Sequence, residues 1–188
     1  MKASALKALF DSMHYPKWFD HNAKVIRWSA EDVQRAEAQL GQPLDPELRE
    51  AVLGGVVPAT LFCFAGNEHS FLTAKQACDL STPTDLSSGL WPFLCDESGE
   101  VLWLIKHGDG ARSGSSFPRG SVICYSMNEY YLASASFDAF FRACAAADRF
   151  QQSHGDDVSI NGLTAHLGPG HSDFINAMQT SVLQWPMD

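Results

Sequence analysis

Two apolar runs around a short acidic turn, at residues 91–96 and 101–107, constrain the fold of this chain more than any other feature. Aromatic and branched residues favour strands, and the Ser-Gly between the runs is typical of a hairpin turn. The second run alternates between Val101, Trp103 and Ile105 on one face and Leu102, Leu104 and Lys106 on the other. Because both faces are largely apolar, we expect a central strand covered, at least in part, on both sides. His107 and Asp109 close this strand, so turn chemistry accounts for the polar residues without catalysis.

The residues ahead of this hairpin have helical periodicity. An apolar stripe near the N-terminus is formed by Leu6, Leu9, Phe10 and Met13. Ser29 has the side chain of an N-cap, the acidic residues after it suit the positive end of a helix dipole, and Gly41 supplies a C-terminal stop. Asp45 followed by Pro46 marks the start of another helix. We therefore predict three helices before the strands.

Strands and then helices follow along the chain. Further β-prone runs stand at residues 60–66, 121–127 and 129–135. Residues 70–81 fit either a short helix or a strand followed by a helix. Helical periodicity returns after Ser136, and a last helix is expected from Asp173. This order predicts an α+β fold with an antiparallel sheet flanked by helices, in a single domain over residues 1–188.

Composition and charge restrict the partners of the chain. Its formal net charge is −9, which disfavours nucleic acid and anionic membranes and is compatible with a basic protein partner. No apolar run approaches the roughly 18 to 20 residues that cross a bilayer. Lys7 and Asp11 interrupt an N-terminal apolar stretch that is too short for a signal peptide, so we expect a cytoplasmic protein with reduced, mostly buried thiols.

Histidines and cysteines raise the question of a metal site. Cys63 with His69, and His166 with His171, are the pairs closest in sequence. Neither spacing matches a compact zinc pair that is backed by a second pair. Neither a metal nor another cofactor is therefore expected.

Catalytic alternatives have weak support in the sequence. Cys78 and Cys95 each precede an aspartate, which would raise the pKa of a thiol nucleophile. The Gly- and Ser-rich segment 107–120 lacks both phosphate-loop patterns, although Arg112 and Arg119 offer charges to an anion. Acid and histidine pairs also occur in the tail, at His154, Asp156, Asp157, His171 and Asp173. A hydrolase that uses His with Asp, or Cys, in surface loops stays an alternative, but we expect no enzyme.

Residues 28–147 resemble the SMI1/KNR4 (SUKH) superfamily. The motifs that carry the resemblance are "WSAEDVQRAEAQLGQPLDPELREAVL", "WPFLCDESGEVLWLIKHG" and "VICYSMNEYYLASASFDAFF". Glu37 and the Leu40–Gly41 pair occupy places that correspond to the opening helix of the family. The chain departs from it at Asp45, which separates the leucine and proline that the family usually has together. Helical extensions over 1–27 and 148–188 lie outside the resemblance, and their apolar stripes fit either a cap on the core or a dimer contact.

The resemblance implies an SMI1/KNR4-like α+β fold and, in bacteria, an immunity protein that neutralises a cognate toxin by direct binding. Such toxins often act on nucleic acids, so the expected partner is a basic toxin domain, with no nucleic acid or membrane bound by the chain itself. From their positions in turns and at strand ends we expect the contact acids to be Asp96, Glu97, Glu100, Asp109 and Glu129. A scaffold or regulatory module that binds a peptide is the alternative. The sequence leaves the oligomeric state open.

Overall fold

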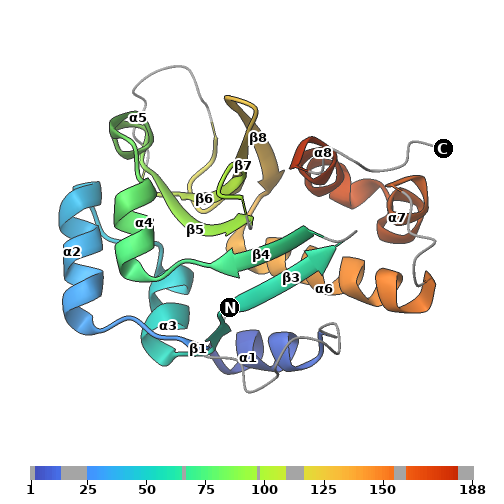
Figure 1. Cartoon of the computed structure of the whole chain (residues 1–188), viewed down its shortest axis with the longest axis horizontal. Coiled ribbons are helices and arrows are strands. Elements are labelled where there is room, and N and C mark those ends of the chain that lie inside the picture. Colours follow the sequence, from blue (N-terminus) through green and yellow to red (C-terminus); the bar gives the residue numbers. More distant parts are fainter. Residues whose placement is uncertain are drawn as a thin grey trace.

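The computed structural model describes residues 3–13, 25–64, 67–96, 98–108, 117–154 and 160–181. It has the expected α+β architecture, an antiparallel sheet flanked by helices (Figure 1). The six strands of this sheet follow the chain in the order β3-β4-β5-β6-β7-β8, and a second, two-stranded sheet joins β1 to β2. The fold class predicted from the order of helices and strands is therefore confirmed.

The strands are β1 (Val25–Ile26), β2 (Val57–Pro58), β3 (Thr60–Phe64), β4 (Asn67–Phe71), β5 (Leu90–Asp96), β6 (Leu102–Lys106), β7 (Val122–Ser126) and β8 (Glu129–Ser134). The helices are α1 (Ala3–Asp11), α2 (Ala30–Leu40), α3 (Pro46–Gly54), α4 (Ala74–Leu80), α5 (Pro83–Ser87), α6 (Phe137–His154), α7 (Ile160–Leu167) and α8 (Ser172–Ser181), with a 3-10 turn, η1 (Pro169–His171). The ambiguous segment 70–81 thus contains the end of a strand and then a helix. Helix α7 lies in the tail, within the helical extension expected over 148–188, although no separate helix was predicted at its residues.

Strand β6 lies between β5 and β7, as its two apolar faces predict. On one face, Trp103 and Ile105 belong to the large core. On the other face, Leu102 and Leu104 form a smaller apolar cluster with Leu90 and Ile123. Leu104 and Ile105 are fully buried although they point to opposite faces. Both sides of the central strand are therefore covered.

Aromatic side chains of α6 fill the large core on one face of the sheet. Phe93 of β5 lies 5.4 Å from Phe137 and 6.0 Å from Phe140, measured between ring centroids. The ring of Trp103 lies 5.1 Å from that of Phe140, and Phe174 of α8 packs 5.9 Å from Phe140. Offset and edge-to-face contacts of this kind stabilise a core beyond the burial of apolar area. The sheet is thus held against α6 and α8.

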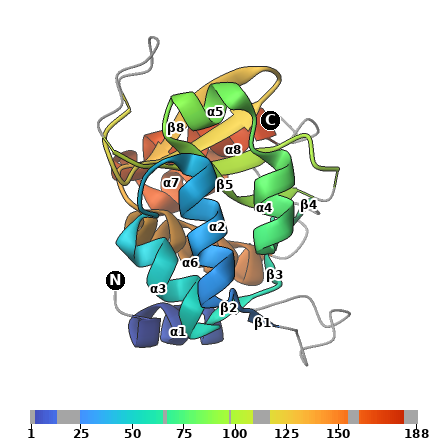
Figure 2. The same ribbon diagram turned by 90° about the vertical axis from the view of Figure 1, so that its left-hand side faces the viewer.

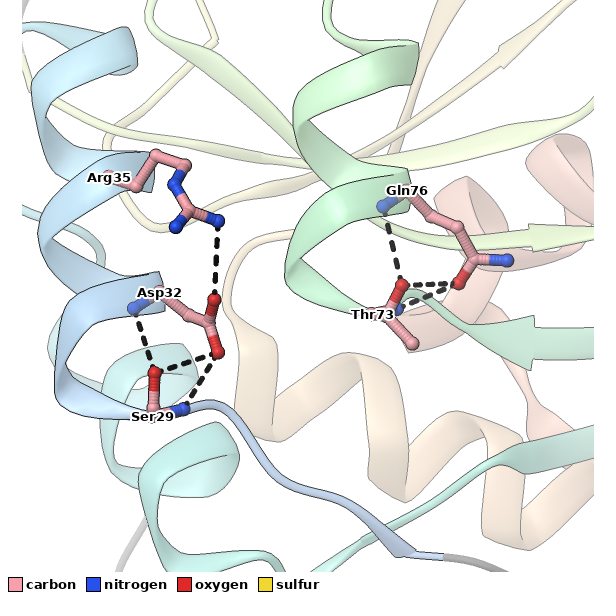
Figure 3. A network of polar contacts seen from close by, with 5 residues as sticks. All are labelled: Ser29, Asp32, Arg35, Thr73 and Gln76. Carbon is pink, nitrogen blue, oxygen red and sulfur yellow. Dashed lines mark hydrogen bonds and ion pairs between the residues drawn. The ribbon is translucent and has the colours of Figure 1, made fainter.

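Side-chain caps set the starts of α2 and α4, as Figure 3 shows. Ser29 and Asp32 form a reciprocal capping box, in which the Ser29 hydroxyl accepts from the Asp32 amide at 3.1 Å. Thr73 and Gln76 form the same arrangement at α4. The two capped helices lie side by side (Figure 2). Because each cap satisfies amides that the helix itself leaves unpaired, the starts are encoded locally.

The terminal helices contribute to the same core as the sheet. Leu6 and Phe10 of α1 are buried, and the Phe10 ring lies 5.2 Å from that of Phe141 in α6. Phe174 and Met178 of α8 are also buried there. The apolar stripes of the terminal helices fitted either a cap on the core or a dimer contact. In the structure these stripes are buried against the core, so the helices cap it. The boundary expected at residue 147 falls inside α6.

Candidate functional site

The turns of two hairpins lie at the same end of the six-stranded sheet. Leu102, at the start of β6, pairs with Tyr125 near the end of β7, so the β5–β6 and β7–β8 turns meet at one end. Three of the expected contact acids, Asp96, Glu100 and Glu129, stand there, and we call them the acidic end. Glu97 and Asp109 lie outside the described residues. The fold therefore brings together acids that are up to 33 positions apart in the sequence.

Asp96 holds the β5–β6 turn together. One carboxylate oxygen accepts from the Ser98 hydroxyl at 2.6 Å, and the other accepts from the Val101 amide at 3.0 Å. Gly99 adopts a left-handed φ of 74°, which a residue with a side chain rarely adopts. This agrees with the turn role predicted for the stretch. Asp96 adds charge to the acidic end, but its first task is structural.

Glu100 and Glu129 are free of such a structural task. Both side chains are exposed, and neither forms an ion pair with a residue that the structure describes. The Tyr131 hydroxyl donates to Glu129 at 2.7 Å, and this bond is the main cause that raises the pKa of Tyr131. A carboxylate that accepts a hydrogen bond from a tyrosine still presents its charge to solvent. These two acids are thus available to a cationic partner.

The thiols in the described part of the chain are poor nucleophiles. Burial raises the pKa of Cys95, and Asp96 raises it further, in the direction expected from the sequence. Burial also raises the pKa of Cys78, and it raises that of Cys124 to about 12. Because the thiolate is the reactive form, a raised pKa lowers reactivity near neutral pH. Cys63 has no described side chain.

The histidines of the C-terminal helices are engaged in local contacts. The His154 ring packs 4.2 Å from that of Phe150, and His166 packs 5.2 Å from the same ring. A ring nitrogen of His171 lies 2.9 Å from the Leu167 carbonyl. Within the residues described, no three His, Cys, Asp or Glu side chains gather as metal ligands would. Asp156 and Asp157, two acids of the hydrolase alternative, lie outside the described residues. The contacts found for the described histidines of the tail are to Phe150, Ser153 and Leu167 and include no aspartate.

A groove of about 970 Å³ lies at the corner between α2 and α3. Its lining residues are Glu37, Pro43, Leu44, Pro46, Arg49, Glu50, Leu53 and Gly54. Glu37 accepts from the Leu44 amide at 3.2 Å and lies 3.5 Å from the guanidinium of Arg49, so it braces the corner. The lining has no histidine, cysteine or hydroxyl side chain. It therefore offers neither a hydroxyl or thiol nucleophile nor a histidine base, and its Glu37 is engaged in bracing the corner.

Buried polar contacts that were not predicted from the sequence join α5 to the second face of the sheet, and we call them the α5 tether. The Tyr130 hydroxyl donates to buried Asp85 at 2.7 Å, and the ammonium of Lys106 donates to the Ser88 carbonyl. Lys106 is only 3% exposed, although lysine is rarely buried. The available signal was the position of Lys106 on an apolar face. These contacts hold a short helix in place and do not form an open site.

His107 is a second polar side chain hidden behind this face. It is 2% exposed, and its two ring nitrogens have no hydrogen-bond partner among the residues described. Burial, and then the nearby charges of Arg119 and Lys106, lower its pKa to about 3. A neutral imidazole that solvent does not reach cannot take a proton from a substrate. His107 therefore bears on the stability of the fold and not on catalysis.

No protein-family model matches the sequence, and no curated protein matches it. The resemblance to SMI1/KNR4 proteins thus rests on the quoted motifs and stays a prediction. In the described part of the chain, every helix is too short or too polar to cross a bilayer.

Proposed function

We propose that this chain is a protein-binding module without catalytic activity, and that it is an immunity protein that neutralises a basic toxin domain in the cytoplasm. The observation that carries the proposal is the acidic end of the sheet. Asp96, Glu100 and Glu129 stand there, and residues 90–105 and 121–141 contain no Lys, Arg or His. Lys106 is the one basic residue in strands β5 to β8, and it pairs with Leu90 at the opposite end of the sheet, so no cation of these strands lies beside the acidic end.

The acidic end carries charge of one sign, and such a surface favours binding of a partner with the opposite charge. Complementary charge raises the rate of encounter and disfavours wrong partners more than it adds to affinity. A toxin that acts on nucleic acid carries a basic substrate surface, because phosphate binding needs one. An acidic sheet end that covers such a surface would block the substrate. Binding alone would then neutralise the toxin.

Co-purification with the product of the adjacent gene tests the proposal. We expect a complex whose association slows steeply as the salt concentration rises from about 20 mM to about 500 mM. The reason is that the distance over which exposed charges act falls from about 30 Å near 0.01 M salt to about 3 Å near 1 M. The double variant Glu100→Gln with Glu129→Gln should slow association about tenfold at low salt. Asp96 is left unchanged because the turn needs it.

The matched control is Glu31→Gln with Glu50→Gln, which makes the same change in net charge with exposed acids on α2 and α3. This pair should leave association within about twofold, because its charges lie away from the acidic end. Equal slowing by both pairs would show an effect of net charge alone. No complex at either salt would contradict the immunity role. A complex without rescue from toxicity would favour the scaffold or regulatory module.

A further inference from the structure

Met127 stands exposed at the tip of the β7–β8 hairpin. Its side chain is 58% exposed, and among the described residues only Val25, at 56%, is a comparably exposed large apolar side chain. Ser126 pairs with Glu129, so Met127 and Asn128 form a two-residue turn. Because the Met127 side chain is exposed, it does not contribute to the packing of the core.

The backbone at Met127 is also unfavourable for methionine. Met127 has a φ of 52° and Asn128 a φ of 65°, and these are the two non-glycine residues with positive φ in the described chain. A two-residue turn with positive φ at both positions is a type I′ feature, and it favours Asn, Asp or Gly. Asn128 follows that preference and Met127 does not. A strained residue whose side chain does not pack is an indication of function.

Two tyrosines, Tyr125 and Tyr130, pack together on the strands next to this turn. Tyr125 and Tyr130 are directly opposite on β7 and β8, with ring centroids 4.9 Å apart, and both are half-buried. The Tyr125 hydroxyl donates to the Asn128 side chain at 3.1 Å, and Tyr130 is held by Asp85 through the α5 tether. The tip is therefore presented on a rigid base. Rigid presentation lowers the entropy cost of binding, and Met and Tyr are enriched at protein interfaces.

Charge around the tip decides which partner it fits. Glu129 directly follows the turn, and Glu100 lies at the same end of the sheet. Residues 90–105 and 121–141 contain no Lys, Arg or His, and Lys106 lies at the opposite end of β6. A second copy of this chain would bring like charges together, which disfavours it. A partner with an apolar pocket rimmed by Lys and Arg would complement both features.

We propose that Met127 is the anchor of the interface, inserted into an apolar pocket of the basic partner while Glu100 and Glu129 face the cationic rim of that pocket. This inference rests on the proposed function and names the surface that performs it. Apolar anchors at the centre of an interface carry most of the binding energy, and the surrounding charges set the rate of encounter.

The variant Met127→Asn tests the anchor, because asparagine suits the turn better than methionine and lacks the apolar side chain. We expect the dissociation constant for the product of the adjacent gene to rise about 30-fold or more, mainly through faster dissociation. The midpoint of thermal unfolding should stay equal or rise. Val25→Asn is the matched control, since it removes the other exposed apolar side chain, and it should change affinity less than twofold.

The possible outcomes separate the anchor from the function. Tight binding by the unmodified protein and by Met127→Asn alike would overturn the anchor and leave the proposed function standing. Equal weakening by Met127→Asn and Val25→Asn would also overturn it. Failure of the unmodified protein to bind would refute the proposed function, and the anchor with it.

Discussion

Lowering the pH should destabilise the fold through His107. In the folded protein this histidine is buried beside Arg119 and Lys106, and its pKa is lowered to about 3 from an ordinary value of 6.5. An unfolded chain exposes the ring, which then takes up a proton near its ordinary pKa. Between pH 6.5 and pH 3, His107 is therefore protonated in the unfolded state and neutral in the folded state. The contribution of neutral His107 is complete above pH 6.5 and is lost as the pH falls toward 3.

The two pKa values set the size of this effect. Each unit of difference corresponds to about 1.4 kcal/mol, so the loss approaches about 5 kcal/mol below pH 3. A pH of 5 lies about 1.5 units below the pKa of the histidine in the unfolded chain. Protonation therefore stabilises the unfolded state by about 2 kcal/mol at this pH. A loss of this size is a substantial part of the 5 to 15 kcal/mol that stabilise a typical domain. The chain should therefore unfold at clearly lower denaturant concentration at pH 5 than at pH 7.5.

Urea unfolding followed by tryptophan fluorescence at pH 7.5 and pH 5 measures this loss. His107→Leu removes the titrating ring, whose two nitrogens have no hydrogen-bond partner in the described part of the chain. The difference in unfolding free energy between the two pH values should therefore shrink by about 2 kcal/mol. His166→Leu, which removes an exposed histidine from α7, controls for the loss of a histidine as such. The reasoning would be refuted if His107→Leu kept the full pH dependence of the unmodified protein.

Two further predictions concern local contacts. Ser29→Ala removes the cap that the Asp32 amide uses and should lower the free energy of unfolding by about 1 kcal/mol; an unchanged urea midpoint would contradict a role for this cap in stability. Tyr130→Phe leaves a buried oxygen of Asp85 without its donor and should cost about 1 to 2 kcal/mol. Tyr131→Phe, which removes only an exposed contact, should cost less than about 0.5 kcal/mol, and equal losses from both variants in the same urea assay would argue against the α5 tether.

The positions of the acids on the fold explain why sequence reasoning located them. Glu100 and Glu129 follow turn residues, and turn residues at the end of a sheet are exposed in most hairpins. Their exposure is confirmed, whereas their contact with a partner stays a prediction. Asp96 shows the limit of that reasoning. The same position in a turn also allows a carboxylate to be used up in backbone hydrogen bonds.

Local features of the sequence determined the helix starts and the central strand. Ser29, Asp45 and Pro46 stand where the structure begins α2 and α3, because a cap acts on amides only two or three residues away. The two apolar faces of β6 determined its internal position, since only a strand covered on both sides buries both sets of side chains. These signals lie within a few residues of the structure that they specify.

Only the tertiary structure decided which distant residues meet. Lys106 donates to the Ser88 carbonyl just after α5, and His107 is buried within the influence of the Arg119 charge. No periodicity within β6 reveals either of these distant neighbours. Helix α7 follows the same rule, because its short amphipathic pattern gains stability mainly by packing against α6 and α8. The acidic end and the strained Met127 likewise arise from the register of antiparallel strands. Register is a property of paired strands, so the sequence of each strand supplies the residues but the pairing decides what surface they form.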